Sequence, residues 1–133
     1  MESENAVAQG KWWSFGLWFV QAILAAAFLA AGGMKLFMTV EEFGSTGAKW
    51  AGDVPLALFR FIGVAEVLGA VGLVVPAATG IYPRLTPLAA AGLVMIQVLA
   101  ASMHIARGDG MVAMNICFAG LAGLVGWGRR RST

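Results

Sequence analysis

The sequence predicts an all-α protein, an integral membrane antiparallel four-helix bundle. Hydrophobic residues make up 59% of the 133-residue chain and charged residues only 12%, against about 25% charged residues in a typical soluble domain. The apolar residues fall into four stretches long enough to cross a bilayer. Short connections between them favour antiparallel neighbours. Because four spans use nearly the whole chain, we expect a single transmembrane domain over residues 1–133.

The first predicted span covers residues 12–38 and opens with tryptophans, which favour the membrane–water interface. Residues 1–10 are polar and are expected to fray. The apolar stretch is longer than the roughly 7–15 residues of a signal peptide, so we expect a retained span. Ala22, Ala26 and Ala30 recur every fourth residue, which predicts a smooth face for close helix packing.

The second predicted span, residues 56–75, is the stretch on which the site prediction depends. It carries Glu66 about 16 Å from Pro55 at 1.5 Å per residue, and we expect it to end at Pro76. A carboxylate at that depth is costly in lipid unless it is protonated, paired or facing a polar cavity. Glu66 is therefore the first candidate for a functional residue.

The remaining elements follow from length, charge and turn signals. Residues 39–54 form the longest connection and carry several charges, and their Phe43 and Trp50 are expected to lie against the membrane surface. The third predicted span covers residues 85–105 and the fourth covers residues 111–127. Polar turns separate these two spans from their neighbours.

Basic residues near the span ends predict the orientation in the membrane. Five of them lie on the side that holds both termini (Lys11, Arg84, Arg129, Arg130 and Arg131), and two lie on the other side (Lys49 and Arg107). Basic residues favour the cytoplasmic side, so both termini are predicted to be cytoplasmic.

Polar residues from all four spans are predicted to gather in the non-cytoplasmic half of the bundle. Besides Glu66 they are Lys35, Arg60, Gln97, His104 and Asn115. Gln97 lies seven residues before His104, two helical turns deeper on the same face, and should match Glu66 in depth. The cytoplasmic half is expected to be nearly all apolar. This asymmetry predicts a site in the outer half.

These residues also have structural interpretations. Glu66 can form an ion pair with Lys35 or Arg60, and both basic residues can extend toward the headgroups. Arg60 can instead neutralise an acid of the long connection. Gln97 and Asn115 are residue types that form hydrogen bonds between membrane helices, and a histidine at an interface is commonly a hydrogen-bonded structural residue.

Three stretches and one further residue resemble the DoxX-like family of small four-span membrane proteins. They are GGMKL at 32–36, RFIGVAEVLGAVGLVVP at 60–76, LTPLAAAGLVMIQVLAASMHIARGD at 85–109, and Asn115. The similarity covers roughly residues 20–120 and implies a multi-pass bundle in a bacterial inner membrane. The family takes its name from a subunit associated with thiosulfate- and quinol-linked respiratory chemistry. Its suggested functional residues correspond here to Lys35, Arg60, Glu66, His104 and Asn115.

Two functions follow from these observations. The first is a redox-associated subunit that binds a quinone or a similar lipophilic small molecule in an outer-half pocket. Its catalytic residues would be Glu66 and His104, which would exchange protons with the ligand; its ligand-binding residues would be Lys35, Arg60, Gln97 and Asn115. The alternative is a non-catalytic accessory or assembly subunit of a larger membrane complex, docked through the small residues Ala119, Gly120, Gly123 and Gly126.

Other chemistries are disfavoured by what the sequence lacks. Cys117 is the single cysteine, so an internal disulfide or a CxxC redox centre is impossible. A single histidine also excludes bis-histidine haem within one chain. Quinone thus remains a possible cofactor, no metal site is expected, and electron transfer would need a partner. The net charge of +2 comes mainly from the C-terminal arginines, so nucleic-acid binding is not expected.

Overall fold

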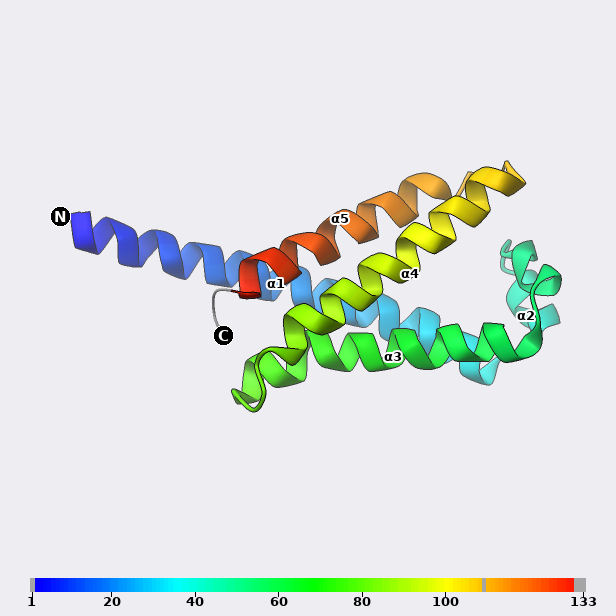
Figure 1. Cartoon of the computed structure of the whole chain (residues 1–133), viewed down its shortest axis with the longest axis horizontal. Coiled ribbons are helices and arrows are strands. Elements are labelled where there is room, and N and C mark those ends of the chain that lie inside the picture. The colour runs from blue at the N-terminus through cyan, green and yellow to red at the C-terminus, as the bar shows by residue number, and fades with distance from the viewer. Residues whose placement is uncertain (1, 109, 131–133) are drawn as a thin grey trace.

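The computed structural model shows the predicted all-α membrane bundle (Figure 1) and describes residues 2–108 and 110–130, with side chains from Gly10 onward. Its long helices are α1 (Glu2–Phe37), α3 (Leu56–Thr79), α4 (Leu85–Arg107) and α5 (Val112–Arg129). Four helical stretches are long and apolar enough to cross a membrane: Gly10–Phe37 within α1, and the whole of α3, α4 and α5. Between α1 and α3 lie two short helices, α2 (Val40–Gly44) and η1 (Lys49–Asp53).

The long helices pack mainly as successive neighbours, α1 on α3, α3 on α4 and α4 on α5, with a smaller contact between α1 and α5. The start of α1 extends beyond the bundle at one end, and α2 lies at the opposite end (Figure 1). A buried apolar core joins the four helices: Leu24, Phe28, Ala70, Leu73, Ala90, Leu93, Ala122 and Val125. Many large apolar side chains also lie on the outside, as is stable where the solvent is lipid.

Helix α1 is longer than predicted. Residues 2–10 were expected to fray, but the helix begins at Glu2 and continues for 36 residues. This segment contains no proline, and its glutamate, alanine and glutamine residues favour helix. At 1.5 Å per residue α1 is about 54 Å long, well beyond the roughly 30 Å of a hydrocarbon core.

The expectation that the second span ends at Pro76 was wrong: α3 continues to Thr79, with Pro76 inside it. A proline inside a helix has no N–H for the carbonyl four residues earlier, here that of Gly72. The hydroxyl of Thr86, in the first turn of α4, donates a hydrogen bond to this Gly72 oxygen at 2.9 Å. Because the neighbouring helix supplies the missing donor, α3 continues for a further turn and ends at Gly80, whose φ is +72°.

Helices α1 and α3 make backbone contact at a pair of glycines. A methyl group on Gly32 would lie 2.7 Å from the Gly63 carbonyl oxygen, and one on Gly63 would lie 2.9 Å from Lys35 Cβ. Real side chains do not tolerate such distances, so only glycine allows this approach.

The two small-residue faces predicted for close packing are largely open within the chain. Ala22, Ala26 and Ala30 are exposed, and Cβ atoms on Gly120 and Gly123 would meet nothing within 4 Å. Within the chain, α1 packs on α3 through another face, which carries Gln21, Leu24, Phe28 and Gly32. On α5, a Cβ on Gly126 would contact Ala90 of α4.

The connection between α1 and α3 folds over the end of the bundle. Helix α2 starts with a capping box, in which the Thr39 side chain accepts a hydrogen bond from Glu42 N–H and the Glu42 carboxylate accepts one from Thr39 N–H. Phe43 and Trp50 were expected on the membrane surface, but both are buried against Phe59 of α3. Burying these three rings in one cluster removes more apolar area from contact with water than surface binding would.

Candidate functional site

The contact between α1 and α3 brings a buried ion pair together. Lys35 and Glu66 each lie three residues, about one turn, after the contacting glycines Gly32 and Gly63. Lys35 Nζ lies 2.7 Å from Glu66 Oε1, and only 7% of Lys35 and 3% of Glu66 is exposed. Of the interpretations that the sequence allowed for Glu66, the geometry matches the ion pair with Lys35.

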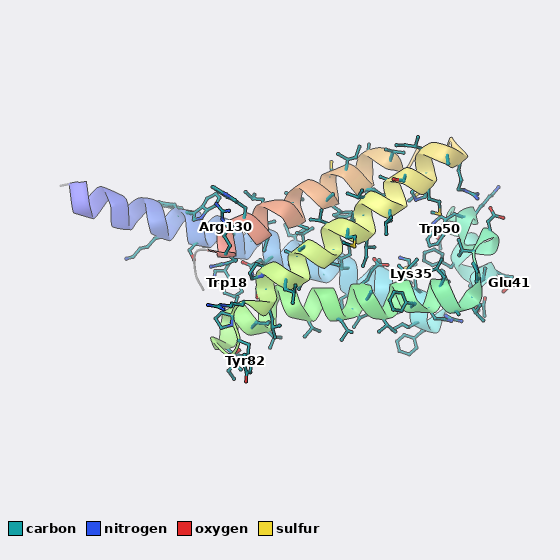
Figure 2. The ribbon with its side chains drawn as sticks, viewed as in Figure 1. Trp18, Lys35, Glu41, Trp50, Tyr82 and Arg130 are labelled. Atoms are coloured by element: carbon teal, nitrogen blue, oxygen red, sulfur yellow. The ribbon has the colours of Figure 1, made fainter. Side chains whose placement is uncertain are left out.

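Aromatic side chains cover this ion pair. The Phe43 and Trp50 ring centroids lie 5.3 Å and 5.9 Å from Lys35 Nζ, within the range of cation–π attraction. Phe59 completes the group, with its centroid 5.1 Å from that of Phe43. Figure 2 shows Lys35 between the long helices and Trp50 toward the α2 end. We call these three residues the aromatic cap.

His104 also lies against the aromatic cap. It is buried in the last turn of α4, and its ring stands edge-on to that of Trp50, with centroids 6.4 Å apart at 89°. Lys35 and His104 come from helices α1 and α4 but share Trp50 as a neighbour. Two of the predicted site residues therefore meet at one aromatic side chain.

Gln97 and Asn115 supply buried hydrogen-bonding atoms that lack partners. Both side chains are buried in α4 and α5, and neither Gln97 Oε1 nor Asn115 Nδ2 has a hydrogen-bond partner among the residues that the structure describes. Most buried polar atoms in proteins are paired, so each such atom needs an explanation. One is an acceptor and the other is a donor.

The buried polar residues described above form two layers along the bundle axis. Glu66 and Gln97 each lie ten residues from the α2-side end of their helices (Leu56 and Arg107), about 15 Å away, whereas His104 and Asn115 lie three residues, about 5 Å, from theirs. Lys35 reaches Glu66 from the end of α1. We call Lys35, Glu66, Gln97, His104 and Asn115 the outer polar cluster, after the half of the bundle in which the sequence predicted them.

Arg60 is near this cluster but is bonded to backbone. Its Nη1 donates to the carbonyl oxygens of Lys35 and Met38, at 2.6 Å and 2.7 Å, which otherwise lack partners at the end of a helix. Neutralising an acid of the connection was one alternative for Arg60; the structure instead shows it bonded to these backbone oxygens, and Asp53 pairs with Arg107. Arg60 therefore fixes the end of α1 and, with it, the position of Lys35.

The prediction that the other half of the bundle is nearly all apolar was wrong. Gln21, Thr86 and Arg129 are buried there. Gln21 Nε2 donates to the Leu73 carbonyl oxygen at 2.5 Å, and Arg129 Nε donates to Gln21 Oε1 at 2.7 Å. Gln21 was visible in the sequence as a polar residue within an apolar span, but Arg129 had been interpreted only through membrane orientation.

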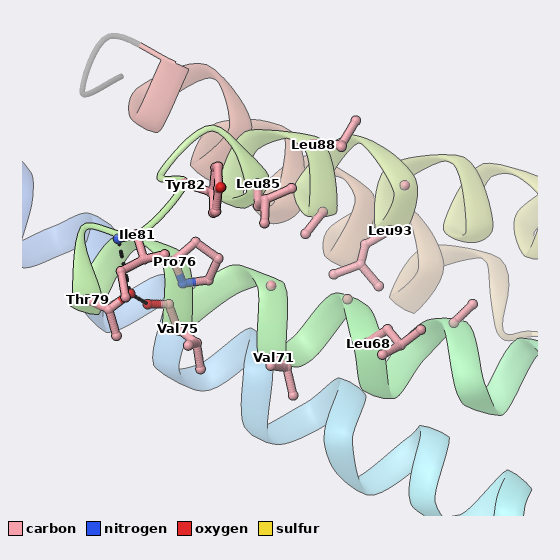
Figure 3. A pocket seen from close by; sticks show the side chains of 15 residues that line it. Leu68, Val71, Val75, Pro76, Thr79, Ile81, Tyr82, Leu85, Leu88 and Leu93 are labelled. Carbon is pink, nitrogen blue, oxygen red and sulfur yellow. Dashed lines mark hydrogen bonds between the residues drawn. The ribbon is translucent and has the colours of Figure 1, made fainter.

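A groove lies between α3 and α4, at the end of the bundle where a short connection joins these two helices (Figure 3). It measures about 580 Å³, and its lining is apolar, with Leu68, Val75, Tyr82 and Leu88 among its residues. None of the six predicted site residues lines it. The groove is thus a different feature from the polar outer-half pocket that the sequence predicted.

The fold and the site together define a small four-span helical membrane protein with a charged pair buried under an aromatic cap. The chain belongs to the DoxX-like family, whose model matches residues 19–125. The resemblance seen in the sequence is thereby confirmed. Among curated proteins and among solved structures, nothing matches the chain.

Proposed function

We propose that the outer polar cluster binds a quinone or a similar lipophilic molecule that carries oxygen atoms, and that the chain is a subunit associated with membrane redox chemistry. The observation that carries the proposal is the pair of buried, unpartnered atoms Gln97 Oε1 and Asn115 Nδ2. A quinone carbonyl accepts a hydrogen bond and would suit Asn115 Nδ2. A quinol hydroxyl donates one and would suit Gln97 Oε1.

The other cluster residues supply charge and protons. Lys35 and Glu66 are in contact. If Glu66 is protonated, the positive charge of Lys35 is available to stabilise a negative charge on an oxygen of the bound ligand. Glu66 and His104 would exchange protons with the ligand. Converting a quinone to a quinol takes two electrons and two protons; the electrons would come from a redox partner subunit, and this chain would hold the ligand and handle the protons.

The test is quinone binding by the purified protein in mild detergent, measured by native mass spectrometry and by quenching of tryptophan fluorescence. Trp50 lies in the aromatic cap, so the part of the quenching that disappears in Trp50→Phe reports on this site. Asn115→Leu and Gln97→Leu should each weaken binding about tenfold or more, as expected for the loss of a buried hydrogen bond.

A matched control is Ser102→Ala, an exposed position on α4 whose hydroxyl donates a hydrogen bond to the Val98 carbonyl oxygen of the same helix. It should bind the quinone as the wild type does. Glu66→Gln keeps an oxygen acceptor for Lys35 but removes its counter-charge, so it should fold with reduced stability, and proton-coupled turnover with a redox partner should be lost. Unchanged binding in both leucine variants would refute the proposal.

A non-catalytic accessory role is the second candidate. It is favoured by the open faces of α1 and α5: among the described residues, Ala26 is exposed, and Cβ atoms on Gly120 and Gly123 would meet nothing within 4 Å. Small residues let another helix approach closely. A stoichiometric protein partner that is lost in Gly120→Leu and Gly123→Leu, with no quinone bound, would support this function over the first.

A further inference from the structure

Arg129, at the end of α5, is a buried cation, and no acidic side chain that the structure describes pairs with it. Only 9% of it is exposed. Its Nε donates to Gln21 Oε1, and its guanidinium carbon lies 4.8 Å from the centroid of Trp18. Its Nη2 is buried and has no hydrogen-bond partner among the described residues. The guanidinium therefore has an N–H donor without a partner and, among the residues that the structure describes, no carboxylate paired with it.

The acids with described side chains do not neutralise this charge. Glu66 pairs with Lys35, and Asp53 pairs with Arg107. Glu42 closes the capping box of α2, and Glu41 is exposed on the same helix. These acids belong to the α2 end, whereas Trp18 and Arg130 lie toward the other end (Figure 2).

Gln21 orients Arg129 but cannot balance its charge. Its Nε2 is fixed by donation to the Leu73 carbonyl, which turns Oε1 toward the arginine. A buried cation without an anion is strongly unfavourable.

The surroundings of Arg129 are those of a membrane–water interface. The Trp13 and Trp127 rings meet edge-on with centroids 5.9 Å apart, and tryptophans gather at the depth of lipid headgroups. Arg130 lies over Trp127 at 5.6 Å, and Lys11 is exposed on α1. Basic pockets between helices at this depth attract anionic headgroups.

We propose that Arg129, oriented by Gln21 and Trp18, binds the phosphate of an anionic lipid headgroup. A guanidinium matches phosphate oxygens with parallel N–H donors, which makes it better suited than an ammonium to this anion. Arg130, on the surface beside it, adds positive charge. The site lies in the opposite half of the bundle from the outer polar cluster and does not depend on quinone binding.

The experiment uses the full chain in mild detergent with one lipid added at a time. Phosphatidylglycerol, phosphatidylcholine and inorganic phosphate are compared by native mass spectrometry and by thermal unfolding. Phosphatidylglycerol should be retained and should raise the unfolding temperature, and the other two should do neither. If phosphatidylcholine is retained equally, the anion preference is refuted; equal protection by inorganic phosphate would refute the assignment to a lipid.

Arg129→Gln should weaken phosphatidylglycerol binding about tenfold or more, as expected for the loss of a charge-assisted hydrogen bond. Arg130→Gln makes the same change of charge on an exposed neighbour and should have a much smaller effect. Equal losses in the two variants would reduce the site to nonspecific surface charge and overturn the proposal.

Gln21→Glu tests the same idea while keeping Arg129, and so remains informative if Arg129→Gln does not fold. A carboxylate in place of the amide would give the guanidinium an internal anion. The preference for phosphatidylglycerol over phosphatidylcholine should then disappear. An undiminished preference in Gln21→Glu would contradict the proposal.

Discussion

The Lys35–Glu66 ion pair is stable in an apolar bundle because both charges are present and in contact. Each is nearly fully buried, so neither can recover its hydration if the other is removed. Losing one partner of a buried pair costs more than losing both, because a single unpaired charge remains in a medium of low dielectric constant.

Lys35→Met and Glu66→Leu are therefore each expected to destabilise the protein by about 3–5 kcal/mol. The double variant should be markedly more stable than either single variant. The measurement is a double-mutant cycle of unfolding in detergent, followed by helical circular dichroism. Additive effects in the double variant would mean that the two side chains do not depend on each other.

A second residue-scale pairing joins Thr86 to the carbonyl that Pro76 leaves without a donor. Thr86→Val keeps the shape and removes the hydroxyl, so it should cost about 1–3 kcal/mol. Pro76→Ala introduces an N–H for the same Gly72 oxygen. We expect the Thr86→Val penalty to shrink in the Pro76→Ala background, again measured by unfolding in detergent.

Thr79→Val is the matched control for this cycle. Its hydroxyl also bonds to a backbone carbonyl, that of Val75, but it is exposed at the end of α3. It should change stability little, whether residue 76 is proline or alanine. A Thr86→Val loss of stability that is equal in both backgrounds would show that the Thr86 hydroxyl does not compensate for the N–H missing at Pro76.

At the scale of elements, the contact between α1 and α3 is set by two glycines. Gly63→Ala would place a methyl group 2.9 Å from Lys35 Cβ and 3.0 Å from the Gly32 carbonyl oxygen. The helices must separate, so we expect a loss of about 1–3 kcal/mol and a weaker Lys35–Glu66 contact.

Gly33→Ala is the matched control, since a Cβ there would meet nothing within 4 Å. It should be neutral or stabilise α1 slightly, because alanine favours helix over glycine. Unfolding in detergent compares the two variants. Equal destabilisation by both would show that the loss comes from the helix itself and not from its contact with α3.

The elements themselves were largely predictable from the sequence, because long apolar stretches separated by polar turns define membrane helices. The errors came from contacts between distant residues. Pro76 was interpreted as a helix end because the donor that replaces its N–H, Thr86, belongs to the next helix. Likewise, no local pattern indicates that Gln21 meets Arg129, 108 residues later.

The residues of the outer polar cluster were named from the sequence, but the way they pack was not predicted. Lys35, Glu66 and His104 were identified from their depth and do lie buried toward one end. The aromatic cap was missed because Phe43 and Trp50 stand in a charged connection, where aromatic residues favour a membrane surface. Their burial depends on Phe59 and Lys35, which come from two other elements.

At the scale of the whole molecule, we propose that both termini face the cytoplasm of a bacterial inner membrane. The prediction uses Cys117→Ser, which removes the single cysteine. In that background, Ser45→Cys in the α1–α3 connection and Ile81→Cys in the α3–α4 connection are both exposed positions. A membrane-impermeant thiol reagent added to spheroplasts should label Ser45→Cys and not Ile81→Cys.

Detergent solubilisation provides the control, since both cysteines should then react. The opposite labelling pattern in spheroplasts would invert the proposed orientation. It would also place Arg129 and Arg130 on the outer side of the membrane.

The aromatic cap has a consequence for how a ligand would reach the outer polar cluster. Phe43 and Trp50 are packed over the end of the bundle, and the Lys35 side chain beneath them is almost inaccessible to water. A molecule that binds there would therefore arrive sideways, from solution in the bilayer. The ligand concentration that the site meets would be set by how strongly the ligand partitions into lipid. Occupancy of the site would therefore depend on the length of the ligand's hydrocarbon tail and on its solubility in oil more than on its concentration in water.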